Sequence, residues 1–545
     1  MADGPVELRR DISGFTVRWN RRVAAMATAF GDWPDCTVAE LARDRAASDP
    51  DRILCIEGDR SLSAGEIYRM ACALAGWFDA NGLRAGDVVS FQLPNWWEAN
   101  VINIAAAMLG IVVNPLIPIY RDAEVSHILT ASGSRLIFVP EVFRKFDYPG
   151  MMRRLADELP PDFRVVTVRG GGGEGFEDLV KAPPLSGPRS VDPNAVKLVL
   201  FTSGTTGRPK GVLHTHNTIH ADGMKMVPAL RLVDDDHVFC PSPLTHVTGY
   251  LWLLNHPWLA GLPAVTLDIW EPSRAFDLAE RHRCAFILGA TPFLRGLIEE
   301  AHRRNGSLPH LRQFLCGGAA VPPSLIYEAA RVFDNCIPWR NFGASEALTM
   351  TRSPDSRSEL RLGAETDGRL HHCEVRIVDL GTGVPLAEGE EGEICVREPS
   401  MAVGYAQPED NTDSYDEDGF FRMGDIGRLV EHGHILVTGR KKDLIIRSGE
   451  NISAKEIEDV LLASGAVEDV AVVSMPNAAT GEAICAFVVA HQPPSLAEIA
   501  RIVADAGLAR QKTPEHLVAI EALPRTSSGK VRKDLLREQA RALAS

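Results

Sequence analysis

A glycine-rich loop between two apolar runs constrains this chain more than any other feature. The stretch LVLFTSGTTGRPKGVLHTH, residues 198–216, begins as an apolar strand, passes through a loop and returns to apolar sequence. The loop, residues 202–211, holds three glycines, four hydroxyl side chains and two cationic side chains. Glycines let a backbone wrap closely around a ligand, while hydroxyls, free N–H groups and a lysine bind phosphate oxygens. The pattern therefore predicts a phosphate-binding loop at the end of a strand.

Two other interpretations of this loop are weaker. The Walker A pattern G-x-x-x-x-G-K-[ST] does not fit, because counting from Gly204 places Pro209 where the second glycine must stand. A surface linker is the second alternative, but Ser-Thr-Gly linkers rarely follow a Val-Leu-Phe strand so closely. The residues predicted to surround the phosphates are Thr202, Ser203, Gly204, Thr205, Thr206, Gly207 and Lys210.

Helical and strand patterns alternate over residues 40–165. LSAGEIYRMACALAGWFDANG predicts an amphipathic helix that ends at Gly82. VVSFQLPN predicts a buried strand, and WWEANVINIAAAMLGIVV a helix followed by a strand. Such alternation is typical of parallel sheets covered by helices. The run GGGGEG, residues 170–175, lacks the G-x-G-x-x-G spacing and is interpreted as a surface loop.

The rest of the chain predicts three further regions. Residues 195–345 form a second α/β region. From Glu374 the strands VRIVDL, GEICVRE and RLVEHGHILVTGR predict a small and largely antiparallel β region. Past Lys442, helix and strand patterns predict a compact α+β domain of about 100 residues. The expected fold class is a multidomain α/β protein, with two α/β subdomains and a small β region followed by a small α+β C-terminal domain.

The charge balance disfavours one class of partner. The 545 residues include 57 Lys and Arg against 72 Asp and Glu, a formal net charge of −15. A broad nucleic-acid footprint needs clustered basic charge. We therefore expect no nucleic-acid partner, and an anionic substrate must be held by local cations.

Cysteine usage and apolar runs bear on the compartment. Ten cysteines without a C-x-x-C pair predict reduced thiols rather than a disulfide framework or a zinc site. The first residues, MADGPVELRRDISG, lack the apolar core of a signal peptide. The longest apolar stretch, residues 105–113, is too short to span a bilayer. We expect a cytoplasmic location and no membrane insertion.

With four further motifs in matching order, residues 202–211 resemble the ATP-binding loop of the adenylate-forming superfamily. That superfamily includes acyl-CoA synthetases, adenylation domains of peptide synthetases and beetle luciferases. The resemblance covers nearly the whole chain and implies a small carboxylic acid, ATP and CoA as substrates, with Mg²⁺ as cofactor. The segment 94–129 looks most like cyclohexanecarboxylate-CoA ligases and related short- or medium-chain fatty acyl-CoA synthetases.

Two motifs resemble the superfamily's nucleotide contacts. NFGASE, residues 341–346, matches aromatic-Gly-x-Thr-Glu with serine for threonine, and Ala347 weakens the alternative of a G-x-S-x-G nucleophile elbow. DGFFRMGD, residues 418–425, matches D-G-[WF]-[FL]-x-[TS]-G-D, with Met423 in place of a small hydroxyl residue. The resemblance implies Mg²⁺ at Glu346 and the ribose hydroxyls at Asp425. The other implied nucleotide contacts are Asn341, Phe342, Gly343 and Ser345.

The resemblance also implies a swinging C-terminal domain. GRKKD, residues 439–443, matches the hinge motif, in which Arg440 reaches the nucleotide and Lys442 is the hinge position. The implied domains are 1–439 and 443–545, joined by a hinge at 440–442. PRTSSGK, residues 524–530, matches P-[RK]-T-x-x-G-K, so that Lys530 is the mobile catalytic lysine. A solvated turn is the alternative for the charged hinge cluster.

Two weaker matches concern the acyl and CoA sites. PLTHVTG, residues 243–249, resembles P-L-F-H-x-x-G and implies that His246 borders the acyl group and gates the CoA channel. Ser448 and Gly449 are assigned to the same channel. CGGAA, residues 316–320, resembles the glycine-rich strand end that abuts adenine, which implies contacts at Gly318 and Ala319.

The resemblance as a whole implies an AMP-forming acyl-CoA synthetase that acts on a cyclic, short- or medium-chain acid. The first step forms acyl-AMP and pyrophosphate, and the second transfers the acyl group to CoA. Three alternatives stay open: an adenylation enzyme that serves a carrier protein, a luciferase-type oxygenase, and a non-catalytic nucleotide-binding paralogue. A homodimer is a further expectation.

Overall fold

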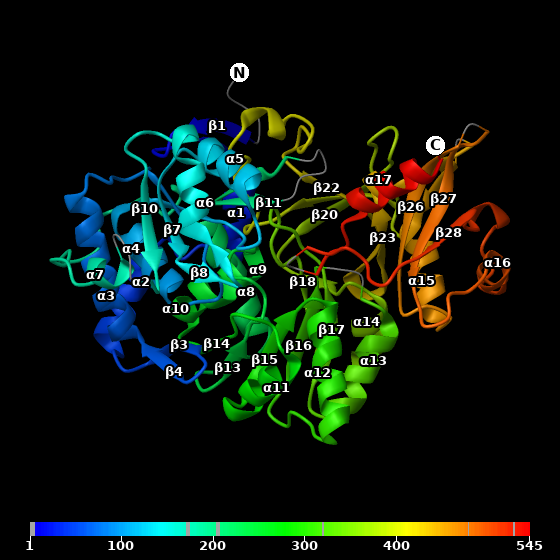
Figure 1. The fold of residues 1–545 in the computed structure, drawn as a ribbon, viewed down its shortest axis with the longest axis horizontal. Helices are drawn as coiled ribbons and strands as arrows, with labels where there is room; N and C mark the ends of the chain where they lie inside the picture. The colour runs from blue at the N-terminus through cyan, green and yellow to red at the C-terminus, as the bar shows by residue number, and fades with distance from the viewer. Residues whose placement is uncertain are drawn as a thin grey trace.

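Figure 1 shows a large body, which contains the chain up to strand β23, and a smaller unit formed from β24 onward. This computed structural model describes residues 6–170, 175–202, 208–318, 321–448, 450–477, 479–526 and 529–544. The mixed architecture of α/β sheets, an antiparallel sheet and a small C-terminal unit confirms the predicted fold class.

The first sheet of the body has six strands in the order β10-β7-β5-β6-β11-β12. Its strands run parallel except β12, which pairs with β11 in an antiparallel hairpin. All residues of β5 and β6 are buried, as expected for strands covered on both faces. The strands are β5 (Val88–Phe91), β6 (Val112–Pro115), β7 (Ser134–Pro140), β10 (Arg164–Val168), β11 (Val196–Thr202) and β12 (Lys210–Thr215).

The second sheet has seven strands in the order β17-β16-β15-β13-β14-β3-β4. It is parallel apart from the terminal β3–β4 hairpin. The strands are β3 (Ile53–Glu57), β4 (Arg60–Ser63), β13 (His237–Phe239), β14 (Ala264–Thr266), β15 (Cys284–Gly289), β16 (Gln313–Gly317) and β17 (Ile337–Asn341).

These two sheets exchange strands, which the sequence did not predict. The hairpin β3–β4 lies within the first predicted α/β region but pairs with β14 of the second sheet. Conversely, β11 lies in the second predicted region but pairs with β6 of the first sheet. The predicted division into residues 40–165 and 195–345 is therefore wrong in this respect, because local patterns give strand type but not the partner strand.

The third sheet is antiparallel, as predicted, and has the order β18-β19-β23-β22-β21-β20. The long pair β22 and β23 places Asp425 directly opposite Arg440. Both candidate nucleotide residues therefore lie at one end of this ribbon. The strands are β18 (Thr351–Arg352), β19 (Arg369–Leu370), β20 (Glu374–Val378), β21 (Gly392–Arg397), β22 (Phe421–Val430) and β23 (His434–Arg440).

The C-terminal unit contains its own sheet, β25-β24-β27-β26, with β28 beside β27. A short 3₁₀ turn, η6 (Lys441–Asp443), leads into it from β23, so the predicted domain boundaries fall at this crossing and stay a prediction. Its strands are β24 (Leu444–Arg447), β25 (Glu450–Ser453), β26 (Asp469–Asn477), β27 (Gly481–Val489) and β28 (His516–Ala519). Its helices are α15 (Ala454–Ala463), α16 (Leu496–Asp505) and α17 (Lys533–Ala544).

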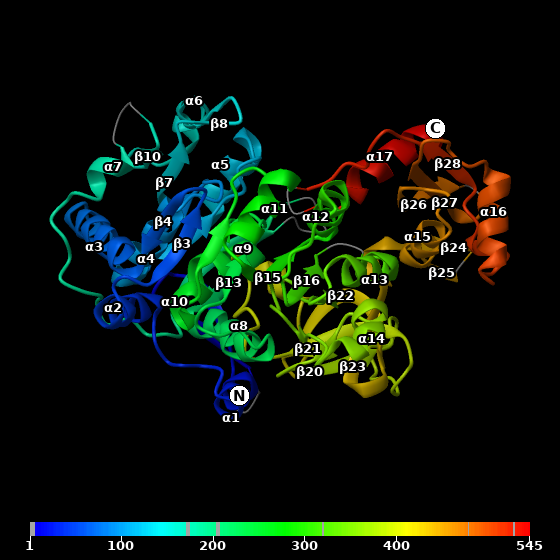
Figure 2. The same ribbon diagram turned by 90° about the horizontal axis from the view of Figure 1, so that it is seen from below.

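Helices cover both large sheets, as Figure 2 shows from below. Helix α3 begins after Ser63, whose side chain forms a capping box with Glu66, and it ends just before Gly82, as predicted. The α-helices of the body, α3 included, are α1 (Arg21–Phe30), α2 (Val38–Ser48), α3 (Ala64–Ala80), α4 (Glu98–Leu109), α5 (Asp122–Ser132), α6 (Tyr148–Arg154), α7 (Phe176–Leu179), α8 (His216–Ala229), α9 (Val247–Gly249), α10 (His256–Ala260), α11 (Pro272–Arg281), α12 (Thr291–Arg304), α13 (Pro323–Val332) and α14 (Leu360–Glu365).

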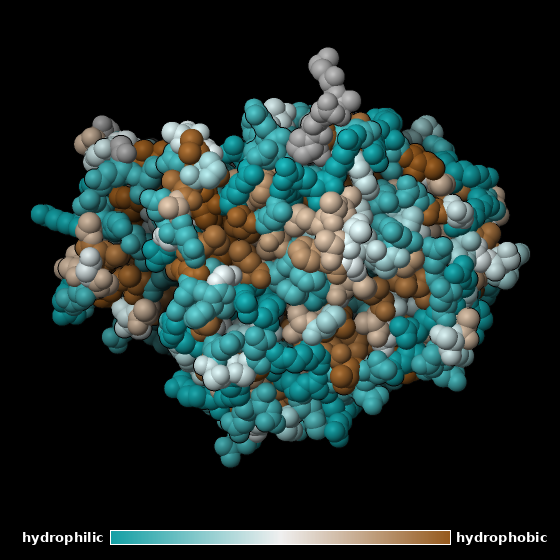
Figure 3. All heavy atoms as spheres, turned by 180° about the vertical axis from the view of Figure 1, so that it is seen from behind, coloured by the Kyte–Doolittle hydropathy of each residue, from teal (hydrophilic) through white to brown (hydrophobic). Residues whose placement is uncertain are grey.

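Hydrophilic side chains dominate the rear face, with apolar groups scattered between them (Figure 3). Within the described ranges, no helix is both long and apolar enough to cross a bilayer. All ten cysteines are free thiols, and eight of them are buried, in agreement with the sequence prediction. The hairpins β1 (Val6–Arg10) with β2 (Thr16–Asn20) and β8 (Val142–Phe143) with β9 (Phe146–Asp147) complete the body.

Candidate active site

Strands β11 and β12 form the two arms of the predicted phosphate loop. Thr202 and Lys210 are the last paired residues of the hairpin, so the loop spans the gap between them. The predicted loop residues Ser203, Gly204, Thr205, Thr206 and Gly207 lie outside the described residues. Of the loop predictions, the structure therefore places Thr202 and Lys210.

The Lys210 side chain contacts one acidic and one aromatic side chain. Its Nζ lies 3.0 Å from the Asp410 carboxylate and 5.3 Å from the centre of the Tyr405 ring. The ion pair is about one-fifth exposed on either side, so it is only partly screened by water. A phosphate that entered the loop would compete with Asp410 for this cation.

The motif at residues 341–346 leaves β17 and folds back on itself. The Asn341 side-chain oxygen accepts a hydrogen bond from the Thr351 hydroxyl at 3.0 Å, and the Phe342 N–H donates to that hydroxyl at 3.1 Å. A Cβ on Gly343 would lie 1.8 Å from the Leu348 carbonyl oxygen, so only glycine fits there. This tight return presents Ser345 and Glu346 at the turn of the loop.

Glu346 is anchored through both its backbone and its side chain. The Ala402 N–H donates to its carbonyl at 2.8 Å, and the Tyr405 hydroxyl donates to its Oε1 at 2.7 Å. The Ser345 carbonyl lies 2.7 Å from His214 Nε2 of β12, and burial lowers the pKa of His214 to about 4. The neutral imidazole therefore donates this hydrogen bond. These contacts fasten the motif loop to the arm of the phosphate loop.

Asp425 and Arg440 form a pair across β22 and β23. The Arg440 Nε lies 2.6 Å from Asp425 Oδ1. Asp425 is buried, while almost half of the Arg440 side chain is exposed. The negative charge of Asp425 raises the pKa of Arg440, so the guanidinium stays charged at neutral pH. One oxygen of Asp425 is thus held while the other stays available to a ligand.

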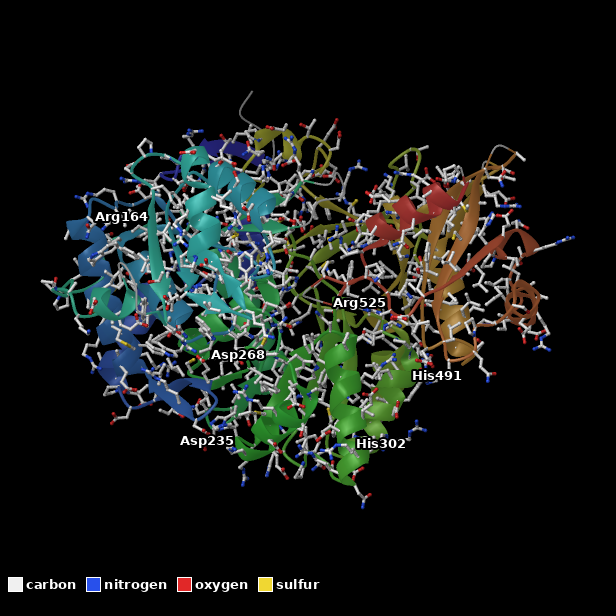
Figure 4. All side chains as sticks on the ribbon, viewed as in Figure 1. Arg164, Asp235, Asp268, His302, His491 and Arg525 are labelled. Carbon is white, nitrogen blue, oxygen red and sulfur yellow. The ribbon has the colours of Figure 1, made fainter. Side chains whose placement is uncertain are left out.

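Lys530 reaches the large body from the C-terminal unit. Its loop is closed by a hydrogen bond from the Thr526 N–H to the Lys530 carbonyl at 2.7 Å. A Cβ on Gly529 would lie 3.4 Å from the Cβ of Ala290, at the start of α12. Figure 4 labels Arg525 on the segment that leads to this contact, between the two parts of the molecule.

Burial and four charged side chains act on the pKa of Lys530. Burial lowers the pKa of Lys530 to about 8; nearby Arg440 and Lys442 lower it further, while Asp425 and Glu346 oppose the shift. The structure therefore brings five predicted site residues from four motifs into one electrostatic group. The group consists of Glu346, Asp425, Arg440, Lys442 and Lys530.

His246 lies beside the same group. It is the N-cap of α9, in a turn where a Cβ on Gly249 would lie 2.1 Å from the Pro243 carbonyl oxygen. Burial and the positive charge of Lys530 lower the pKa of His246 to about 3. The imidazole is therefore neutral at physiological pH. After α9 the chain continues as the π-helix η2 (Tyr250–Asn255), a form that often marks functional sites.

The remaining predicted contacts are placed in part. Gly317 is paired with Asn341 at the ends of β16 and β17, so Gly318, with φ +79°, follows directly beside the 341–346 motif. Ser448 directly follows β24, and its N–H donates to the Thr480 carbonyl at 2.8 Å. Ala319 and Gly449 lie outside the described residues.

Sequence reasoning missed several residues that shape the site. Tyr405 and Asp410 contact Glu346 and Lys210, but they lie in a loop with no periodic pattern. Asn95 accepts a hydrogen bond from the Leu244 N–H at 2.7 Å and donates to the Ser242 and Leu267 carbonyls, which fixes the turn before His246. In the sequence, the Pro-Asn pair that follows β5 is the feature that could have identified Asn95.

The arrangement is consistent with a metal shared between protein and ligand. Over the described ranges, no three His, Cys, Asp or Glu side chains form a metal cluster. Mg²⁺ is usually held by one or two carboxylates together with substrate phosphates and water. Glu346, near the phosphate-loop arm, supplies such a carboxylate.

Known proteins match this chain over almost its full length. The AMP-binding enzyme family matches residues 42–406, and the family of its C-terminal domain matches residues 456–530. The chain therefore belongs to the AMP-binding enzyme family, which confirms the predicted superfamily.

Two curated relatives and one solved structure illustrate the match. A medium-chain fatty-acid–CoA ligase from Escherichia coli is 34% identical over 96% of this chain and 94% of its own. A 2,3-dihydroxybenzoate-AMP ligase from Bacillus subtilis is 30% identical over 97% and 98%. ATP-bound MatB from Rhodopseudomonas palustris superposes with a TM-score of 0.84, at 26% identity over 94% of this chain and all of that one. The predicted enzyme class, a ligase that forms acyl adenylates, is confirmed.

Proposed function

We propose that this protein is a carboxylate-CoA ligase that consumes ATP in two steps. In the first, a carboxylate oxygen attacks the α-phosphorus of ATP and pyrophosphate leaves. In the second, the CoA thiol attacks the acyl carbon, its proton is released and AMP leaves. The observation that carries the proposal is the placement of Lys530 with Asp425, Glu346 and His246, which joins the C-terminal unit to the nucleotide motifs.

The first step needs charge stabilisation at the α-phosphate. We assign this role to Lys530, which carries a mobile positive charge at a half-buried position. Asp425 accepts hydrogen bonds from the ribose hydroxyls, and Arg440 holds it in place. The phosphate loop with Lys210, and the ends of β16 and β17, cradle the rest of the nucleotide.

Glu346 is the residue we assign to Mg²⁺. A bound Mg²⁺ would supply positive charge that offsets the negative charge of the ATP phosphates. Glu346 would hold it through the carboxylate oxygen that does not accept from Tyr405.

The second step needs an open path for the CoA thiol. Lys530 lies against the nucleotide motifs in this structure, so we propose that the C-terminal unit then turns about Lys442 and carries Lys530 away. His246, Ser448 and Gly449 are the residues we assign to the CoA channel.

An apolar acid of modest length is the proposed substrate. Val247 and Tyr250 follow His246 and are buried, and one relative is named a medium-chain fatty-acid–CoA ligase. Each methylene that fits an apolar pocket contributes about 0.8 kcal/mol. The value of kcat/KM should therefore rise with chain length and fall once the pocket is full, while dicarboxylates should be poor because a buried charge lacks a partner.

A panel of carboxylic acids, assayed for AMP release with and without CoA, tests this proposal. We expect CoA-dependent AMP release that is greatest with cyclohexanecarboxylate, hexanoate or octanoate. Faster turnover of palmitate or of a dicarboxylate would contradict the substrate assignment. Absence of AMP release with every acid would instead favour a non-catalytic paralogue.

An adenylation enzyme that serves a carrier protein is the second candidate. The 30% identity to an enzyme named an AMP ligase favours it. This candidate would be supported if acyl-AMP accumulates and the addition of CoA leaves the turnover unchanged. A cytoplasmic location, supported by the ten free thiols, and a homodimeric state stay proposals, tested by fractionation and by light scattering.

A further inference from the structure

A buried tyrosine lies between the two motifs assigned to ATP and Mg²⁺. The segment 401–406 runs beside the phosphate-loop arm on one side and the 341–346 motif on the other. The Ala406 N–H donates to the Gly211 carbonyl at 2.7 Å, and the Ala402 N–H donates to the Glu346 carbonyl at 2.8 Å. Tyr405, at 5% exposure, lies in the middle of this segment.

The Tyr405 side chain contacts one charged residue from each motif. Its hydroxyl donates to Glu346 Oε1 at 2.7 Å. Its ring lies under the Lys210 ammonium, 5.3 Å from ring centre to Nζ, a distance typical of a cation–π contact. The Tyr405 N–H donates to the Asn411 side-chain oxygen at 3.1 Å, so the backbone that carries the ring is itself fixed.

The direction of the hydrogen bond to Glu346 is set by chemistry. A phenol O–H donates hydrogen bonds, and a carboxylate oxygen accepts them. The Tyr405 hydroxyl is therefore the donor and Glu346 Oε1 the acceptor. The bond occupies one lone pair of Oε1 and so fixes one oxygen of the Glu346 carboxylate.

We propose that Tyr405 is a positioning residue for the adenylation step: it orients Glu346 toward Mg²⁺ and sets the resting place of Lys210 beside the phosphates. This proposal rests on the proposed function of Glu346 as the metal ligand. Groups that hydrogen-bond to a metal ligand typically contribute a factor of about 10 to 100 in metal affinity. Because no part of Tyr405 need touch substrate, its effect should be confined to the half-reaction that uses Mg²⁺.

The test is the variant Tyr405→Phe, which removes the hydroxyl and keeps the ring under Lys210. ATP–pyrophosphate exchange is measured against free Mg²⁺ at fixed ATP. We expect the half-saturating Mg²⁺ concentration to rise about 10-fold or more, with the rate restored at high Mg²⁺. Conversion of preformed acyl-AMP to acyl-CoA should be unchanged.

Tyr415→Phe is the matched control. Tyr415 is half-buried, and its buried hydroxyl has no hydrogen-bond partner among the described residues. Its loss should leave the Mg²⁺ dependence as in the parent protein. Equal losses of both half-reactions in Tyr405→Phe, without a change in Mg²⁺ dependence, would show a purely structural role and overturn the proposal.

Glu346→Gln separates failure of this proposal from failure of the metal assignment. If Glu346→Gln raises the Mg²⁺ requirement and Tyr405→Phe does not, Tyr405 has no positioning role and the proposed function stands. If Glu346→Gln leaves the Mg²⁺ requirement unchanged, Glu346 is not the metal ligand, and both assignments fail together.

Discussion

Lys530 combines a proposed catalytic role with a lowered pKa, and its removal gives the first prediction. Lys530→Ala should reduce acyl-AMP formation by a factor of about 10² to 10³, the usual cost of one transition-state charge contact. Thioester formation from preformed acyl-AMP should largely survive, because we propose that this step takes place after Lys530 has moved away from the nucleotide site. Separate assays of the two half-reactions check this. Equal loss in both, with folding intact, would refute the division of labour.

The pKa of Lys530 predicts a pH dependence. With a pKa of about 8 in the free enzyme, the ammonium is present below pH 8 and is lost as the pH rises through that value. The value of kcat/KM for adenylation should therefore fall above about pH 8. In Lys530→Arg the guanidinium stays charged over this pH range. The fall of kcat/KM above about pH 8 should therefore disappear in this variant, whatever its absolute rate. The same fall in both proteins would assign it to another group.

Much of the site could be predicted from single residues, because each motif carries its own chemical requirement. Gly343 is needed where a Cβ would strike the Leu348 carbonyl, and Asp425 is the second acidic residue that a simple turn does not explain. Tyr405 and Asp410 could not be predicted in this way. Their roles arise only when the 401–411 segment packs beside β12, a contact between distant parts of the chain.

At the scale of elements, the short turn η6 carries the chain from β23 into the C-terminal unit. Lys442→Pro should leave adenylation nearly unchanged and reduce CoA transfer strongly, because proline fixes φ near −65° and removes a backbone donor. Single-turnover measurements of each half-reaction check this. Lys442→Ala, which keeps backbone freedom, is the control. An overall rate close to that of the parent would place the hinge elsewhere.

Local patterns predicted the elements better than their arrangement. Helix α3 ends just before Gly82, as its pattern predicted, and the strands β5 and β6 follow from short apolar runs. The partner of each strand was not predictable. Ile56 of β3 is as apolar as any residue of β5, and only tertiary packing decides that it lies beside Val265 of β14.

At the scale of the whole molecule, the contact between Gly529 and Ala290 reports the position of the C-terminal unit. The 3.4 Å between their Cβ positions is near the 3.5–4.5 Å typical of disulfides. The oxidised double variant Gly529→Cys, Ala290→Cys should therefore form acyl-AMP but fail to make acyl-CoA. Reduction should restore the second step.

Two controls make this experiment specific. Each single cysteine variant should be insensitive to the oxidant, since the ten native cysteines are free and mostly buried. The reduced double variant must retain adenylation, because cysteine at residue 529 adopts a positive φ of 86° at some cost in strain. Full overall turnover by the cross-linked protein would show that the C-terminal unit need not move.

The strand exchange between the two large sheets has a consequence for the folding of the chain during synthesis. During synthesis, β3 and β4 emerge early, yet their neighbour β14 follows only after the first sheet has received β11 and β12. Such long-range pairing raises the contact order and slows folding. Neither sheet can be completed from one continuous half of the body. We therefore expect that cutting the chain within the body yields no fragment that folds alone. Recombination among relatives should therefore succeed at the single crossing near Lys442 and fail within the body.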